Sequence, residues 1–158
     1  MKILFQTMFP MIQIFVNGLP KGQPRPRAFA VRGMVRMYDA GTAEGWKAAI
    51  ADEWRRSVPA APKIMQPVSL TLVFNMPRVK SHFNSKGNLK ESAPKAYPKK
   101  PDADNLAKAV MDCMTQLGVW QDDDQVVILK VVKRYSEGNT IQTMRPGCEI
   151  TLMDLPEI

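Results

Sequence analysis

Apolar side chains recur along this chain with a period of two in some stretches and of about 3.6 in others. The period of two predicts four strands. A separate hairpin, with Arg32-Gly33 at its turn, is predicted in the sequence between the first and the second of these strands. The strands span 12–16, 68–76, 126–135 and 148–153, and the hairpin joins 28–31 to 34–38. Between 16 and 28, five glycines and prolines forbid a regular element and predict a shaped, extended loop.

The first predicted helix spans 42–57, where apolar side chains recur at helical spacing. Thr42 is expected to cap its N-terminus. Trp46, Ile50 and Trp54 form its apolar stripe. The stripe is one candidate for a dimer interface, although such a stripe more often faces the protein's own core.

The second predicted helix spans 104–117 and also has an apolar stripe. Asp104 or Asn105 is expected to cap its N-terminus, and Gly118 is expected to end it. Together the elements predict one α+β domain over 1–158, with a mixed sheet and two main helices packed on it. A long basic loop is expected between the central strand and the second helix.

Several bulk features limit the cellular setting. Residues 1–11 are expected to lie outside the fold, either disordered or upstream of a true start at Met11. No run of eighteen apolar residues occurs, so no membrane span is predicted. Two cysteines are too few for a disulfide framework in a chain of 158 residues, which favours a cytoplasmic protein.

The positive charge is concentrated in one stretch. The net charge is +7, and residues 77–101 contribute +6 of it through seven lysines and arginines against Glu91. The stretch has neither helical nor strand periodicity, so we expect a flexible loop that is disordered without a ligand. A basic segment indicates a polyanion such as nucleic acid, although a solvated linker would have the same composition.

Two acidic clusters interrupt this basic chain, PDADN at 101–105 and QDDDQ at 121–125. Asp102 and Asp104 are two residues apart, so in an extended segment their carboxylates lie on the same side. Two carboxylates about 4 Å apart repel by roughly 4 kcal/mol at an effective dielectric of 20. A divalent cation relieves that repulsion, and oxygen ligands favour Mg²⁺ or Mn²⁺.

Asp104, Lys108 and Asp112 are spaced by four and share one stripe of the second helix, away from its apolar side. Lys108 can offset the carboxylates or contact a phosphate, or it can simply form a surface ion pair. The triplet 122–124 follows the helix and, if it folds back, would bring three or four carboxylates together. A solvated turn is the alternative for the triplet taken alone.

Other chemistries lack the residues they need. His82 is the only histidine, which excludes Ser–His–Asp and Cys–His nucleophiles and Cys/His zinc sites; it is expected to be a surface residue. No glycine-rich phosphate loop or dinucleotide fingerprint occurs, so no nucleotide cofactor is expected. Metal-assisted phosphodiester hydrolysis remains.

PDADNLAKAVMDCM and GVWQDDDQV closely resemble the motifs of the RusA-type Holliday junction resolvases of phages, prophages and some bacteria. The family pattern is D-x-D-N-L-x-K, an Asp four residues after the Lys, and then G-x-W-x-D-D-x-Q-V. Every fixed position is matched, and GLPKGQPRPRAF at 18–29 also resembles the family's opening strand and loop. The lysine-rich segment before PDADN is longer than in compact members.

The resemblance implies metal-binding aspartates at Asp102, Asp104 and Asp123 and an essential lysine at Lys108. We place a supporting shell around them and expect further residues to contact the DNA backbone. The supporting residues are Asp112, Asp122 and Asn105, and the DNA contacts are Arg25, Arg27, Lys99 and Lys100. Strand parity would instead pair Asp122 with Asp124 and place Asp123 opposite, but the family pattern favours Asp123.

The expected function is therefore an Mg²⁺-dependent endodeoxyribonuclease that resolves four-way junctions or other branched DNA in recombination and repair. The resemblance implies a homodimer with one site per subunit. A non-catalytic nucleic-acid-binding module, whose aspartates only cap a helix and solvate a turn, is the alternative. A metal-dependent phosphohydrolase with a small substrate is a third reading.

Overall fold

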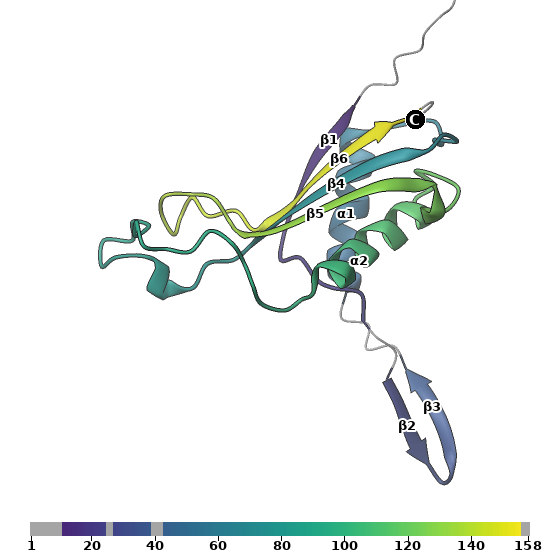
Figure 1. The fold of residues 1–158 in the computed structure, drawn as a ribbon, viewed down its shortest axis with the longest axis horizontal. Helices are drawn as coiled ribbons and strands as arrows, with labels where there is room; N and C mark the ends of the chain where they lie inside the picture. Colours follow the sequence, from purple (N-terminus) through teal and green to yellow (C-terminus); the bar gives the residue numbers. More distant parts are fainter. Residues whose placement is uncertain (1–10, 25–26, 39–42, 156–158) are drawn as a thin grey trace, which may run out of the picture.

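The computed structural model describes residues 11–24, 27–38 and 43–155, and its elements follow the predicted order. Within these residues, one mixed four-stranded sheet carries two helices, which confirms the α+β prediction (Figure 1). No helix in the described part of the chain is long and apolar enough to cross a membrane.

The main sheet has the strand order β1-β6-β4-β5. Its strands β4 and β5 are parallel, whereas β6 is antiparallel to both of its neighbours. Because β4 and β5 are parallel neighbours, their C-terminal ends lie side by side at the same end of the sheet. The strands are β1 (Ile12–Asn17), β4 (Val68–Met76), β5 (Val126–Tyr135) and β6 (Gly147–Asp154), and a separate hairpin joins β2 (Arg27–Val31) to β3 (Met34–Tyr38).

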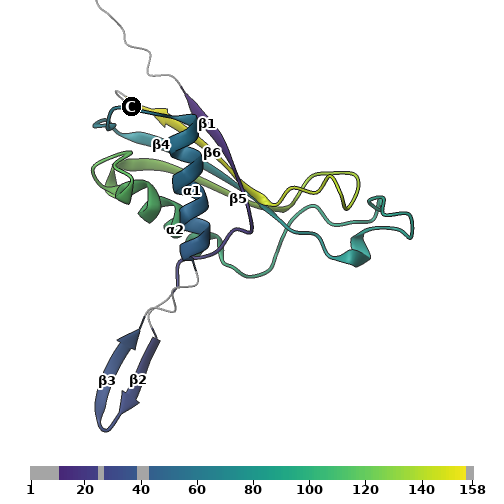
Figure 2. The same ribbon diagram turned by 180° about the vertical axis from the view of Figure 1, so that it is seen from behind.

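The helices α1 (Glu44–Ser57) and α2 (Ala103–Gln116) cover one face of this sheet, as Figure 2 shows from the helix side. Trp46, Ile50 and Trp54 of α1 are buried in the same core as the inward side chains of the sheet. The stripe on α1 therefore faces the core, and the suggestion that it forms a dimer interface is wrong.

The N-terminal caps differ from those predicted. Thr42 lies outside the described residues, and Ala43 occupies the N-cap position of α1. Asp102, rather than Asp104 or Asn105, occupies the N-cap position of α2, because the first helical bond runs from the Leu106 N–H to the Asp102 carbonyl. The C-terminal end was predicted correctly: Gly118 has φ +73° and donates its N–H to a carbonyl of the last turn.

Residues 77–101 and 136–146 form what we call the arm, which extends from the C-terminal ends of β4 and β5 (Figure 1). We expected disorder in the first of these segments, but the structure gives it a defined path. The Leu89 N–H donates to the Asn139 carbonyl at 2.7 Å, and the Asn84 side chain accepts the N–H groups of Lys86 and Asn88. Side chain–backbone bonds, which leave no periodic signal, shape the arm.

The root of the arm is built around Tyr135, the last residue of β5. Its ring contacts those of His82 and Tyr97, with centroids 4.7 Å and 5.0 Å away, and the Arg78 guanidinium lies 5.3 Å from its centroid. His82 is therefore half-buried in this packing and not the surface residue that we expected. Burial, and then the charge of Arg78, lower the pKa of His82.

Candidate active site on helix α2

The outward face of α2 carries the predicted charged stripe. Asp104 and Lys108 are exposed and Asp112 is half-buried, whereas Leu106 and Val110 on the other side of the helix are fully buried. The Lys108 ammonium lies 3.7 Å from an Asp112 carboxylate oxygen. The i,i+4 ion pair thus exists, and at this exposure it contributes a few tenths of a kcal/mol, about 0.3–0.5.

The loop after β1 packs against the first turn of α2. The Gln23 N–H donates to the Asn105 carbonyl at 2.9 Å. A Cβ added at Gly22 would lie 3.2 Å from the Asn105 Cβ and 3.3 Å from the Pro101 Cβ, so only glycine fits without displacing a neighbour. This contact brings Gly22 and Gln23 of the β1–β2 loop to the acidic end of the helix, a proximity that the sequence did not predict.

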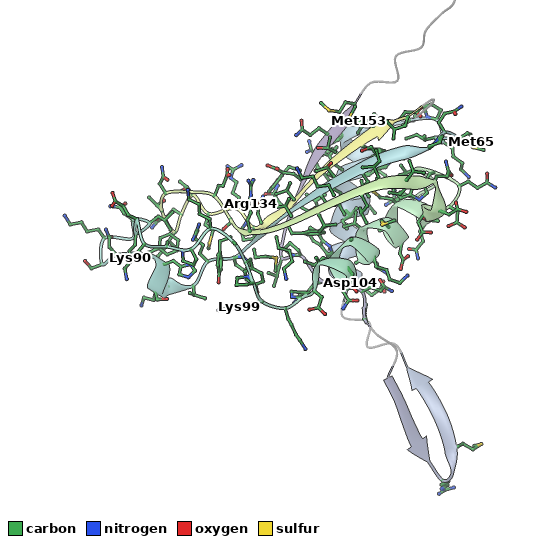
Figure 3. All side chains as sticks on the ribbon, in the orientation of Figure 1. Met65, Lys90, Lys99, Asp104, Arg134 and Met153 are labelled. Carbon is green, nitrogen blue, oxygen red and sulfur yellow. The ribbon has the colours of Figure 1, made fainter. Side chains whose placement is uncertain are left out.

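The two predicted arginine contacts cannot be placed: Arg25 lies outside the described residues, and so does the side chain of Arg27. Lys99 and Lys100 are exposed immediately before α2, and Figure 3 shows Lys99 on the path from the arm to Asp104. The Lys99 carbonyl accepts a hydrogen bond from the Lys133 ammonium, and the Lys100 carbonyl accepts one from the Tyr97 hydroxyl. The sequence analysis did not predict these bonds.

The acidic triplet forms a short 3₁₀ turn, η2 (Asp123–Gln125), between α2 and β5. Gln125 holds this turn with its side-chain amide. The amide oxygen accepts the N–H groups of Gln121 and Asp122 at 2.7 Å and 3.2 Å. The amide nitrogen donates to the carbonyls of Ile64 and Gln66 at 3.0 Å and 3.1 Å. The glutamine of the motif therefore presents the aspartates and fixes their turn to the connection before β4.

The tryptophan of the motif also has a structural role. Trp120 is fully buried, and its Nε1–H donates to the Thr115 hydroxyl at 2.7 Å. Its burial draws the chain back along α2 after Gly118, and the Val119 N–H closes on the Met114 carbonyl. Trp120 and Gln125, which are not themselves acidic, thus hold the acidic triplet beside α2.

The fold perturbs the pKa of Asp123 in the acidic triplet. A hydrogen bond with the Asp122 carboxyl raises the pKa of Asp123 most, followed by partial burial and the negative charges of Asp122 and Asp112; Lys108 opposes these effects. The fold therefore brings the η2 turn to the middle of α2, beside Asp112 and Lys108. The acidic triplet thus folds back onto α2, which the sequence analysis considered as one of two alternatives.

Asp102 and Asp104 lie at the other end of the stripe (Figure 3 labels Asp104). Eight residues separate Asp104 from Asp112, which is about 12 Å along the helix axis. Among the residues that the structure describes, no three His, Cys, Asp or Glu side chains are already arranged to hold a metal ion. The convergence of Asp102, Asp104 and Asp123 therefore stays a prediction.

The residues nevertheless fit a hard divalent cation by donor type. Carboxylate oxygens are the ligands that Mg²⁺ and Mn²⁺ prefer. The hydrogen bond with Asp122 and partial burial raise the pKa of Asp123 most, and the smaller contribution from the negative charges of Asp122 and Asp112 is the kind of repulsion that a bound cation relieves. The aspartates therefore match a divalent cation in their chemical type. In the described residues, Asp102, Asp104 and Asp123 are not gathered into one metal site.

Comparison with known proteins adds the family. Residues 17–144 match the family model for Endodeoxyribonuclease RusA. The chain is also 38% identical over 136 residues to the uncharacterized protein YqaN of Bacillus subtilis (strain 168), covering 84% of this chain and 94% of that protein. The family match includes the β1–β2 loop, α2, η2 and the arm up to residue 144. The chain therefore belongs to the RusA endodeoxyribonuclease family.

Proposed function

We propose that this protein is a structure-specific endodeoxyribonuclease that uses Mg²⁺ to resolve four-way junctions or related branched DNA in recombination and repair. Family membership supports nuclease activity on branched DNA. The observation that carries the proposal is the proximity of Asp123 to Lys108 and Asp112 on the outward face of α2. Several carboxylates and one ammonium are thereby gathered at an exposed surface.

We assign metal binding to Asp102, Asp104 and Asp123. Lys108 is assigned to the phosphate, which its exposed ammonium can reach if it exchanges its long contact with Asp112. When bound, Mg²⁺ supplies Lewis-acid chemistry and charge neutralisation, and Mn²⁺ is expected to substitute for it. The supporting residues are Asp112, Asp122 and Asn105.

The arm is the proposed surface for the DNA backbone. Its first segment ends at Pro101, directly before Asp102, and the arm displays exposed lysines along its length, with Lys90 near its far end in Figure 3. The arm contains two carboxylates, Glu91 and Glu137, and Glu137 is paired with Arg134 at 3.1 Å, so the lysines outnumber the acidic groups of the arm. Phosphate contacts of this kind position a protein on DNA without reading sequence. The lysines are Lys80, Lys86, Lys90, Lys95, Lys99 and Lys100; Arg25 and Arg27 are proposed to add to them.

Paired cutting of a two-fold junction requires a homodimer. The face of the sheet opposite the helices is the surface that we propose for it. Met153, Ser69 and Ile128 stand in register across β6, β4 and β5, and the two apolar side chains in this row are 44% and 48% exposed. Exposed apolar groups arranged in a row on an open sheet face are typical of an interface.

A synthetic four-way junction tests the proposal. Wild-type protein is expected to cut it with Mg²⁺ into nicked duplexes and to leave it intact in EDTA. Asp104→Asn is expected to abolish cutting while retaining junction binding. Asp52→Asn on α1 is the matched control, since Asp52 is exposed and pairs only loosely with Arg55, at 3.9 Å.

Full cutting by Asp104→Asn, or no cutting by the wild type at any metal concentration, would overturn the proposal. Junction binding that is indifferent to Mg²⁺ and unchanged in the aspartate variants would instead favour the non-catalytic binding module. The absence of a preassembled group of three metal-binding side chains in the described residues is the observation that keeps this second candidate open.

A further inference from the structure

Lys133 lies near the C-terminal end of β5, on the face of the sheet that the helices cover. It is in register with Phe74 of β4, whose side chain is fully buried. A lysine at such a position buries its aliphatic stem and extends along the sheet so that its ammonium reaches polar partners outside the core. The Lys133 ammonium emerges at the chain segment just before α2 and donates hydrogen bonds to the carbonyls of Lys99 and Pro101, the latter at 2.7 Å.

Tyr97 completes this arrangement. Its hydroxyl donates to the Lys100 carbonyl at 2.9 Å, and its ring centroid lies 5.5 Å from the Lys133 ammonium. The Tyr97 N–H in turn donates to the Lys133 carbonyl at 3.3 Å. The three consecutive carbonyls of 99–101 are therefore all bound by two side chains, one from β5 and one from the arm.

Besides these hydrogen bonds, the segment 99–101 packs through Pro101 against Gly22 of the β1–β2 loop. Lys99 and Lys100 are exposed, and the segment belongs to neither a helix nor a strand. Asp102 follows at once in an extended conformation, with φ −67° and ψ 151°, and α2 begins at the next residue. The path of 99–101 therefore sets the direction in which Asp102 leaves the arm and in which the first turn of α2 presents Asp104.

We propose that Lys133 is a positioning residue for the acidic N-terminus of α2. It acts through the carbonyls of Lys99 and Pro101 and does not itself contact the DNA. The inference rests on the proposed function, because it assigns Lys133 to the placement of aspartates that we assign to the reaction. A charged donor suits this role since charge-assisted bonds are stronger than neutral ones and are directional.

The test compares Lys133→Met with Lys130→Met. Both variants remove one positive charge from β5, but Lys130 is exposed and in register with Thr71, on the open face of the sheet. Single-turnover cutting of a four-way junction with Mg²⁺ is expected to be slowed at least about tenfold in Lys133→Met, because small misplacements of reacting groups are costly. Junction affinity measured in EDTA is expected to match that of Lys130→Met, and Lys133→Arg is expected to restore most of the rate.

Amide hydrogen exchange of the DNA-free protein supplies a readout that does not depend on cutting. In Lys133→Met the N–H groups of Tyr97 and Leu106, which are bonded to the Lys133 and Asp102 carbonyls, are expected to exchange faster. The Val119 N–H, at the far end of α2, is expected to be unchanged. Should Lys133→Met fail to fold, Tyr97→Phe removes the bond to the Lys100 carbonyl alone and is expected to give the same pattern in weaker form.

Equal cutting rates for Lys133→Met and Lys130→Met would overturn the proposal, even if exchange became faster, because Lys133 would then be only an anchor. Weaker junction binding in EDTA with an unchanged cutting rate at saturation would also overturn it, since Lys133 would then act as a DNA contact. A wild-type protein that does not cut at all refutes the proposed function instead. The exchange data alone then decide whether Lys133 orders the entry into α2.

Discussion

The turn that carries Asp122, Asp123 and Asp124 depends on one amide side chain, that of Gln125. The substitution Gln125→Glu is isosteric and keeps the oxygen that accepts the N–H groups of Gln121 and Asp122. It replaces the nitrogen that donates to two backbone carbonyls with a second oxygen. In the variant, a carboxylate oxygen therefore faces the carbonyl oxygens of Ile64 and Gln66, and all three are hydrogen-bond acceptors. The variant also adds a negative charge beside three aspartates.

The magnitude follows from the environment of the two carbonyls. The Ile64 carbonyl bond is partly buried, so its loss leaves an acceptor that water replaces poorly, at about 1–3 kcal/mol. The Gln66 carbonyl bond is exposed, and water can replace most of it. With the added repulsion, we expect the free energy of unfolding to fall by about 2–3 kcal/mol at pH 7. For a domain of this size, that corresponds to a Tm lower by roughly 5–10 °C.

Urea denaturation of Gln125→Glu and of Gln121→Glu measures this loss. Gln121 is exposed, so the same change there is a matched control and is expected to alter stability by less than about 0.5 kcal/mol. The carboxyl that Gln125→Glu introduces faces carbonyls and carboxylates, so its pKa in the folded state lies above the unfolded value of about 4.3. Its destabilisation is therefore largest at neutral pH and shrinks as the pH falls toward that value. Equal stability of the two variants at pH 7, or a loss independent of pH, would refute this account of the turn.

Three further outcomes are expected. Asp123→Asn is expected to abolish cutting and to raise the free energy of unfolding by about 0.5–1 kcal/mol at neutral pH without divalent metal. Because its bond with Asp122 raises the pKa of Asp123 above 3.8, urea denaturation should show that this gain disappears as the pH falls to that value. Burial lowers the pKa of His82 below 6.5, so wild-type stability is expected to fall as the pH drops below 6.5, and less so in His82→Phe, when followed by thermal unfolding. Trp120→Phe loses the bond to Thr115 and core volume, so thermal unfolding should show a loss of about 1–3 kcal/mol.

The sequence predicted the strands of the core well because their burial follows a simple rule. The bounds predicted for β4 and β5 match the observed ones, and along β4 the side chains from Val68 to Phe74 alternate between buried and half-buried. Apolar alternation reports contact with a core directly. The helices were also found from their stripes, but their N-terminal ends shifted, since a cap depends on which carbonyl accepts the first helical bond.

The arm was missed for a physical reason. Its conformation depends on single bonds from Asn84, Arg78 and Tyr97 to nearby or distant backbone groups, and such bonds have no period in the sequence. Lys133 did leave a signal, since it is a charged residue at an inward position of an apolar strand. Its partners are backbone carbonyls, and a sequence does not show where carbonyls point.

The candidate site was predictable in part. Spacing by four placed Asp104, Lys108 and Asp112 on one face of α2, as observed. Strand parity failed for the acidic triplet because Asp123 begins a 3₁₀ turn, in which alternation does not apply. Asp123 is less exposed than the aspartates on either side of it, and its assignment as a metal ligand stays a prediction. The distance between the two acidic clusters depends on a loop and on the fold, and no local pattern encodes it.

Anomalous diffraction from crystals soaked in Mn²⁺ tests the central claim most directly, because it locates the ion and its ligands without relying on activity. The account predicts an anomalous peak with carboxylate oxygens of Asp102, Asp104 and Asp123 around it. A peak held only by Asp112, Asp122 and Asp123, or no peak near α2 in crystals that contain junction DNA, would contradict it.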